Sequence, residues 1–303
     1  MVIIETKLQS IPGFDAEPDI SERDDYCLLV EGASDAKIIQ TLVKNLTLPE
    51  VPSSEPITKV LKIIAVSGKL AEFKFDEAEP RKQAIILDNL LLSYRASETL
   101  RLGIIVDADD DATVTFNKIV EKLIQSKYFP RKHLPTAPYA NEGSDPSKDR
   151  CSVFITPYAD NVLRNGTLEH YFLEALCSDN SPNSLNKVNK DAVVQFAKQA
   201  LGVDVSLDNT NDLFNTVGNH GAKWLTSACL LTLAKRTYEG RPLQGNALLK
   251  QGCQFTADFG YACESKKPII TDLHTWKNLQ ALRDYLTAFL APEPATQPLT
   301  TTP

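Results

Sequence analysis

Three acidic residues in this sequence lie at the ends of short apolar runs, and their side chains are suited to holding a divalent cation. Glu31 follows YCLLV, and Asp107 and Asp109 follow LGIIV. In a parallel sheet with right-handed crossovers, the carboxyl ends of all strands lie on one edge, so these side chains are expected to converge. Carboxylate oxygens are the ligands that Mg²⁺ and Mn²⁺ prefer. The spacing therefore predicts a Mg²⁺ or Mn²⁺ site.

The remaining acids of the DADDD run have a structural interpretation. Aspartates after a strand often cap the next helix or favour its N-terminal dipole, and this explains Asp110 and Asp111 without a metal. Asp111 is kept as a candidate ligand or supporting residue. Asp35, one turn into the helix that follows Glu31, is kept for the same reason and has the same alternative. For Asp107 alone both interpretations are equally good, and its pairing with Glu31 favours the metal.

The elements that must position these acids follow a β-α-β-α-β-α-β-α order. Apolar runs predict strands at 26–32, 60–66, 102–108 and 151–157. Helical periodicity and start signals predict helices at 34–46, 80–94, 112–125 and 166–177. The first residues, MVIIETK, could add an edge strand. This order is typical of a parallel sheet with helices on both faces.

The character of the chain changes along its length, which predicts four regions. Residues 1–24 form an N-terminal arm, and residues 25–177 form the α/β domain. Residues 178–290 are mainly helical and pack on that domain. The tail, 291–303, has the composition of a disordered end.

Composition indicates an ordinary globular protein. The chain has 303 residues, of which 43% are hydrophobic and 23% charged, and its net charge of −7 argues against coating nucleic acid through bulk charge. Six scattered cysteines without a CxxC pair predict free thiols in a reducing cytoplasm. The start lacks the pattern of a signal peptide and no apolar run reaches membrane-spanning length, so a cytoplasmic protein without a membrane partner is expected.

The run LLVEGASDAKII followed by LGIIVDADDDA resembles a Toprim domain, the Rossmann-like fold shared by topoisomerases, primases and several nucleases. Toprim proteins carry a glutamate after the first strand and Asp-x-Asp after the third, which match Glu31, Asp107 and Asp109. Together with SVFITPYADN, GTLEHYFLEAL and NHGAKWLTSACLL, the chain is similar to an uncharacterised family of small Toprim-containing proteins. Nucleases of the OLD (overcoming lysogenization defect) type and some anti-phage effectors have similar domains.

The resemblance implies metal-dependent cleavage of DNA or RNA. Asp107 and Asp109 would anchor the metal, and Glu31 would be a further ligand or the general acid/base. Glu169, at the start of a predicted helix, is a candidate extra ligand, and the alternative is an ordinary exposed glutamate. Lys223, in GNHGAKWL, is the candidate cation for the transition-state charge on the phosphate.

Substrate contacts are expected from basic residues. Lys127, Arg131 and Lys132 belong to a basic segment in which Tyr128 and Phe129 could stack on unpaired bases. Lys69, after a glycine turn, could touch a phosphate, and His220 could assist Lys223. Each has a plain alternative as a solvated surface residue, and for the basic segment that alternative is an ordinary polar helix face.

Two functions from different classes stay open. The first is a Mg²⁺- or Mn²⁺-dependent nuclease, in phage defence or nucleic-acid processing. The second is a non-catalytic Toprim module that binds a nucleotide or nucleic acid and acts with a partner protein. An aspartyl-phosphate protein is disfavoured, because the first strand ends in Glu31, a poor phosphoacceptor. Toprim nucleases often work with an ATPase, and no Walker motif occurs here, so an ATPase would be another chain. A homo-oligomer is compatible with this sequence.

Overall fold

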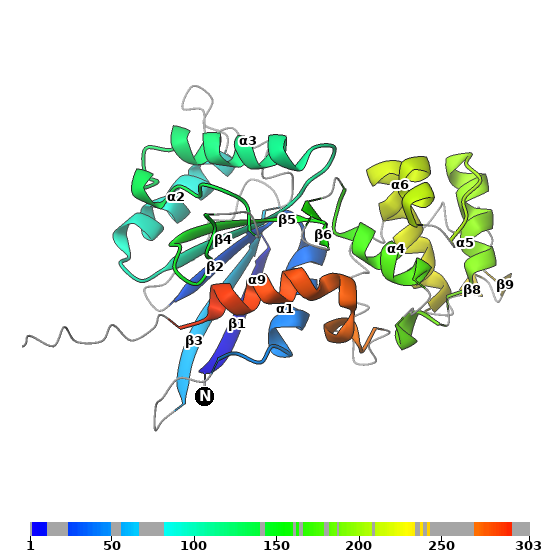
Figure 1. Cartoon of the computed structure of the whole chain (residues 1–303), viewed down its shortest axis with the longest axis horizontal. Helices are drawn as coiled ribbons and strands as arrows, with labels where there is room; N and C mark the ends of the chain where they lie inside the picture. Colours follow the sequence, from blue (N-terminus) through cyan, green and yellow to red (C-terminus); the bar gives the residue numbers. More distant parts are fainter. Residues whose placement is uncertain are drawn as a thin grey trace, which may run out of the picture.

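A parallel sheet forms the centre of the protein (Figure 1). The computed structural model describes residues 2–10, 24–49, 56–66, 82–139, 143–159, 162–163, 166–178, 182–186, 188–207, 210–233, 237–238, 241–242 and 270–292. Within these ranges five parallel strands pair in the order β1-β3-β2-β4-β5. Their bounds are β1 Val2–Ser10, β2 Tyr26–Val30, β3 Ile57–Ala65, β4 Arg101–Asp107 and β5 Cys151–Thr156. The predicted parallel α/β class is confirmed.

The N-terminal residues are part of this sheet. The expected edge strand is present, and β1 runs to Ser10 in parallel register with β3 along its whole length, from Val2 opposite Ile57 to Ser10 opposite Ala65. The predicted division at residue 24 therefore does not separate an appended arm from the sheet. At the start of β1 the half-buried Val2, Ile4 and Thr6 alternate with exposed residues, which suits a half-buried edge strand.

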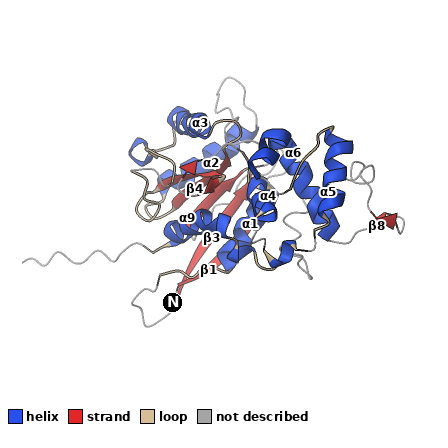
Figure 2. Cartoon of the chain, turned by 45° about the vertical axis from the view of Figure 1, so that its right-hand side comes forward, coloured by secondary structure: helices blue, strands red, loops and turns tan. Residues whose placement is uncertain are grey.

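Helices cover both faces of the sheet (Figures 1 and 2). On one face lie α2, Lys82–Ala96, and α3, Ala112–Gln125, which share a core with Leu102, Ile104 and Val106 of β4. On the other face lie α1, Ala33–Lys44, and α9, Gln280–Leu290, which share a core with Ile105. Because side chains alternate along a strand, Asp107 follows Ile105 onto the face of α1 and α9.

The C-terminal helix α9 is fixed directly to the sheet. A Cβ on Gly103 of β4 would lie 2.8 Å from the Tyr285 hydroxyl and 3.1 Å from the Phe289 ring, so the glycine permits this close packing. The Tyr26 hydroxyl donates to the Leu290 carbonyl at 3.1 Å, and the buried Arg101 guanidinium donates to the Ala291 carbonyl at 2.8 Å. Helix α9 is thus an integral layer of the α/β unit, although α5 and α6 lie between residue 177 and α9 in the chain.

The remaining helices lie beside the carboxyl ends of the strands (Figure 1). They are α4, Glu169–Cys177, α5, Lys190–Phe196, which continues as a π-helical turn over Ala197–Leu201, and α6, Thr210–Leu233. Short 3₁₀ turns occupy Arg131–His133, Asn183–Leu185, Leu273–Thr275 and Lys277–Leu279. Two small hairpins pair β6 Tyr158–Ala159 with β7 Val162–Leu163, and β8 Thr237–Tyr238 with β9 Arg241–Pro242. The mainly helical character expected after residue 177 holds for the described part of that region.

Two further predictions bear on the environment of the protein. Cys27, Cys151, Cys177 and Cys229 are free thiols, as expected, whereas Cys253 and Cys263 lie outside the described residues. Across the described ranges, none of the helices combines the length and apolar character needed to span a membrane. The predicted tail lies outside the description from residue 293 onward.

Candidate functional site

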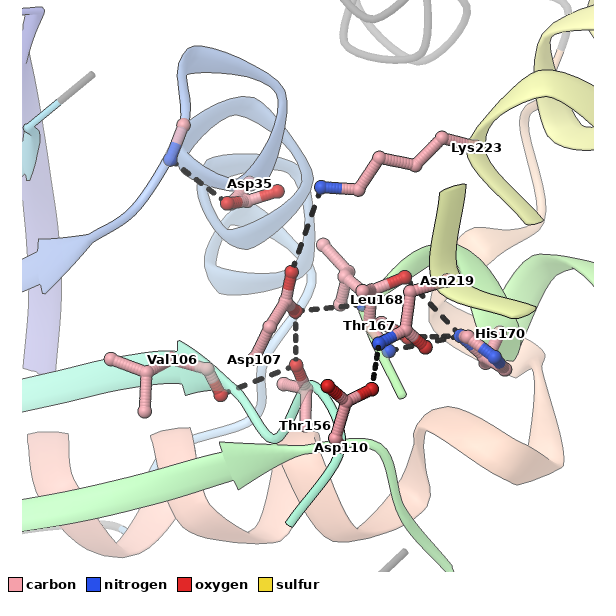
Figure 3. Close-up of polar contacts among 11 residues, drawn as sticks. Asp35, Val106, Asp107, Asp110, Thr156, Thr167, Leu168, His170, Asn219 and Lys223 are labelled. Atoms are coloured by element: carbon pink, nitrogen blue, oxygen red, sulfur yellow. Dashed lines mark hydrogen bonds and ion pairs between the residues drawn. The ribbon is translucent and has the colours of Figure 1, made fainter. Parts of the chain in front are cut away.

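The candidate site surrounds Asp107, the last residue of β4, at the carboxyl edge of the sheet (Figure 3). Glu31 directly follows β2, Asp35 lies in the first turn of α1, and Glu169 is the first residue of α4. Lys223 reaches the site from α6, with its Nζ 4.0 Å from Oδ2 of Asp107. The structure therefore brings together residues from five different elements.

Asp107 is strongly affected by its neighbours. Its side chain is 9% exposed, and burial raises the pKa of its carboxyl well above the usual range. The negative charges of Asp35, Glu169 and Glu31 raise this pKa further, and Lys223 lowers it. Because like charges repel and burying a charge is costly, additional positive charge would stabilise this cluster.

One oxygen of Asp107 is held by two hydrogen bonds. Thr156, directly opposite Asp107 in the β4–β5 register, donates its hydroxyl to Oδ1 at 2.7 Å. The backbone N–H of Leu168 donates to the same oxygen at 2.8 Å. Oδ1 is therefore occupied by protein donors, and Oδ2 faces Lys223 (Figure 3).

The structural role considered for Asp35 is present, and its role at a metal stays a prediction. Its Oδ2 accepts a hydrogen bond from the Gly32 N–H at 2.9 Å, which caps the start of α1. Burial nevertheless raises the pKa of Asp35 to about 7, with a further increase from Glu169, against the lowering effects of the Gly32 N–H and Lys223. Asp35 thus belongs electrostatically to the acidic cluster while it supports the helix that follows Glu31.

Lys223 owes its position to a break in α6. Gly218 has φ 61° and ψ −174°, a backbone conformation that is essentially restricted to glycine. The helix resumes in a new direction, and Asn219, at this restart, donates to Oδ1 of Asp110 at 3.5 Å. Burial acts to lower the pKa of Lys223, but Glu169, Asp107, Asp35 and Glu31 outweigh it, so the pKa is raised and the side chain stays charged.

The rest of the DADDD run is arranged by its backbone. Asp109, at φ 51°, exchanges two backbone hydrogen bonds with Gly166: its N–H donates at 2.9 Å and its carbonyl accepts at 2.7 Å. Asp111 caps α3, because its Oδ1 accepts from the Val114 N–H at 2.9 Å. Capping, the alternative interpretation of Asp111, is therefore present. The role of Asp109 as a metal ligand stays a prediction.

The segment that follows β5 departs from its predicted helix. The helix expected over 166–177 begins at Glu169, because Gly166 is paired with Asp109 and has φ 137°, outside the helical region. The Thr167 N–H then donates to Nδ1 of the buried His170 at 2.9 Å, and burial lowers the pKa of that imidazole to about 4. This loop docks the start of α4 against the end of β4.

Gly166→Ala is expected to destabilise the protein by about 3 kcal/mol, because the new Cβ adds backbone strain to overpacking. It would lie 2.9 Å from the His170 ring. Gly202→Ala is the matched control: Gly202 also has a positive φ, 70°, but a Cβ there meets nothing within 4 Å, so about 1 kcal/mol is expected. Urea unfolding measures both. Equal losses would show that the contact with His170 is unimportant.

Three of the predicted substrate-binding residues lie away from this site. Lys127, Arg131 and Lys132 follow α3, which starts at the site and runs back along the sheet for 14 residues, or about 21 Å. They are exposed near Tyr94, whose hydroxyl bonds Nδ1 of His133 at 3.0 Å, at the opposite edge of the sheet.

Phe129 does not offer the expected stacking surface for a base. It is 4% exposed and stacks on Tyr94 with ring centroids 5.5 Å apart, so that part of the prediction was wrong. Tyr128 is half-buried, with the Lys127 ammonium 5.1 Å from its ring centroid. Lys69 lies outside the described residues, and so does the side chain of His220, although its backbone belongs to α6.

A divalent cation fits this cluster in charge and in donor type. The carboxylates supply oxygen ligands, and their mutual repulsion is what a cation would relieve. In the described part of the chain, however, no three His, Cys, Asp or Glu side chains already form a group that could hold a metal ion. The carboxylates would therefore have to reorient around a bound ion.

Three contacts of the site were missed from the sequence: those of Thr156, the Leu168 N–H and Asn219. Thr156 could have been found from the sequence, because Asp107 and Thr156 are each the last residue of neighbouring strands. Residues at the same position of paired strands are expected to contact each other. The Leu168 N–H and Asn219 depend on the loop after Gly166 and on the break at Gly218, for which the sequence offers little signal.

Together, the fold and the site define an α/β protein with an acidic cluster and a lysine at the carboxyl edge of a parallel sheet. The chain belongs to the family described as "Protein of unknown function (DUF3226)", whose model matches residues 25–207. The match spans β2 to the π-helical turn after α5, and so includes Glu31, Asp35, Asp107 and Glu169. No curated protein and no solved structure matches the chain.

Proposed function

We propose that this protein is a Mg²⁺- or Mn²⁺-dependent nuclease with a Toprim-like catalytic domain. The observation that carries the proposal is the buried Asp107 carboxyl, at a strand end, whose pKa is raised by burial and by three further carboxylates from separate elements. Such a concentration of carboxylates is costly to the fold, and metal binding would account for it. Phosphodiester cleavage is a reaction for which carboxylate-bound Mg²⁺ or Mn²⁺ is suited.

The residues of the chain would divide the work. Oδ2 of Asp107, Asp109, Glu31 and Glu169 would hold the cation, which when bound polarises the scissile phosphate and lowers the pKa of an attacking water. Lys223 would attract a non-bridging phosphate oxygen, since its ammonium stays charged beside the cluster. Glu31, half-buried at the end of β2, would accept the proton of the nucleophile. Any contribution of the basic segment around Lys127 would require a substrate long enough to reach the other edge of the sheet.

The second candidate is a non-catalytic module that binds a nucleotide or nucleic acid. It is favoured by the absence, among the residues described, of a ready-formed group of three metal ligands. The same carboxylates would then bind a cation weakly, as a bridge to a phosphate. For the nuclease, we propose a role in phage defence or nucleic-acid processing, with an ATPase on another chain as a partner.

A cleavage screen separates the two candidates. Supercoiled plasmid, single-stranded DNA and tRNA are incubated with Mn²⁺ or Mg²⁺ and with wild-type protein, Glu31→Gln or Glu121→Gln. The last makes the same substitution on the exposed surface of α3. We expect cleavage by wild type and Glu121→Gln and a loss of at least about 100-fold in Glu31→Gln. Binding without cleavage, at any metal, would favour the module.

A further inference from the structure

Thr156 and Asp107 form a cross-strand pair at the carboxyl edge of the sheet. They are opposite one another in the β4–β5 register, and the Thr156 hydroxyl lies 2.7 Å from Oδ1 of Asp107. Thr156 is 1% exposed, so water cannot readily replace its hydroxyl. The Leu168 N–H approaches the same oxygen at 2.8 Å from the opposite segment of chain. Two donors from two elements therefore fix one oxygen of the carboxylate.

The electrostatics of the cluster make this fixation necessary. Asp35, Glu169 and Glu31 all act on Asp107 as like charges, which favours rotation of its carboxylate away from them. Hydrogen bonds to an ionised carboxylate favour its charged form. They also hold the carboxylate in one orientation and so oppose this rotation. With Oδ1 held by Thr156 and Leu168, Oδ2 is the oxygen presented toward Lys223 and the acidic cluster (Figure 3).

A purely structural role for Thr156 makes a different prediction. The Thr156 hydroxyl is also 3.4 Å from the Val106 carbonyl, a longer contact than the one with Asp107. If the residue served only the strand, valine would be a good substitute, because it has nearly the same shape and a high preference for strands. The hydroxyl, rather than the shape, is what the Asp107 contact requires.

We propose that Thr156 is a positioning residue, whose hydroxyl orients Asp107 so that Oδ2 is presented to a divalent cation. This inference rests on the metal site of the proposed function and extends it to a residue that does not itself bind the metal. Groups that orient a ligand in this way typically change metal affinity by about 10- to 100-fold when they are removed.

The test is the affinity for Mn²⁺, measured by isothermal titration calorimetry at pH 7.5, with no nucleic acid present. Thr156→Val is expected to weaken Mn²⁺ binding by about tenfold or more, whereas Thr156→Ser, which keeps the hydroxyl, stays within about twofold of wild type. Thr115→Val is the matched control: Thr115 is a buried threonine of α3 whose hydroxyl donates to the Ala108 carbonyl at 3.0 Å, and its loss should leave the affinity unchanged.

The outcomes are distinct. Thr156→Ala also removes the hydroxyl, has a smaller side chain and is expected to bind Mn²⁺ as weakly as Thr156→Val. If one of the two variants fails to fold, the other still tests the inference. The inference is overturned if the valine and alanine variants bind Mn²⁺ like wild type, if the serine variant is as weak as they are, or if wild type binds no Mn²⁺. If the affinities follow the expected pattern but the protein cuts no nucleic acid, the role of Thr156 stands and only the proposed nuclease activity is rejected.

Discussion

Asp107→Asn is expected to abolish metal-dependent cleavage and, in the absence of metal, to make the folded protein more stable at pH 8. Asparagine keeps an oxygen that can accept the hydrogen bonds of Thr156 and Leu168, which Oδ1 of Asp107 accepts at 2.7 and 2.8 Å. It removes the negative charge that Asp35, Glu169 and Glu31 oppose. We expect a gain of about 1 kcal/mol, or about 3 °C in thermal midpoint, together with a loss of cleavage of at least about 100-fold.

Asp111→Asn is the matched control for this variant. Asp111 lies four residues further on, is exposed and caps α3 by accepting from the Val114 N–H at 2.9 Å, a role that asparagine fills equally well. Its thermal midpoint and its cleavage should match wild type. Thermal unfolding followed by circular dichroism, with a chelator present, measures the stabilities. A lower midpoint for Asp107→Asn would mean that the charge of Asp107 stabilises the metal-free fold, contrary to its raised pKa.

Mn²⁺ is expected to stabilise the protein strongly at pH 8 and weakly at pH 5. Burial raises the pKa of Asp35 to about 7, so between pH 4 and 7 the folded state holds a proton that the unfolded chain has released. The stability from this group is greatest below pH 4, falls as the pH rises to about 7 and stays low above it. At pH 8 the cluster is ionised and available to a cation, whereas at pH 5 protons compete. At a Mn²⁺ concentration 100 times the Kd, the gain at pH 8 is about 2.7 kcal/mol.

His170 changes the free energy of unfolding with pH in the direction opposite to Asp35. Its contribution must therefore be separated from the effect of Mn²⁺. Its pKa is lowered to about 4, chiefly by burial, so its contribution is complete above the unfolded value of 6.5 and is lost as the pH falls through about 4. Because His170 affects the protein equally with and without metal, the difference between the two unfolding curves cancels it. Asp107→Asn should show little Mn²⁺ stabilisation at either pH. A Mn²⁺ effect of the same size at pH 5 and pH 8 would contradict the assignment of the carboxylates as ligands.

The positions of Glu31, Asp107 and Glu169 could be predicted from the sequence because each depends on a strand end or a helix start. Apolar runs locate the strands, and parallel topology then brings their carboxyl ends to one edge. The basic residues after α3 could not be placed in this way, because their charge carries no information on which edge they occupy. The direction of α3 decides this, and it takes Lys127 and Arg131 away from the acids.

Lys223 was proposed as a cation for the phosphate, and its contact with Asp107 could not be derived from the sequence. An unbroken helix through 210–233 would direct residues 219–223 differently, and the break at Gly218 arises from one backbone conformation. Thr156 shows a different limit. A threonine at the end of a buried strand is ordinary, and its importance depends on the register that sets it opposite Asp107.

The packing of α9 on β4 has a consequence for how the chain acquires its structure during synthesis. The face of the sheet that carries Asp107 is closed by residues 280–290, which pack against Gly103 through Tyr285 and Phe289. Helix α1 covers part of the same face and is made early, but the part of the face over Gly103 stays uncovered until residues 280–290 have been translated. The core between β4 and α9 is therefore completed only after α4 and α6 have been made.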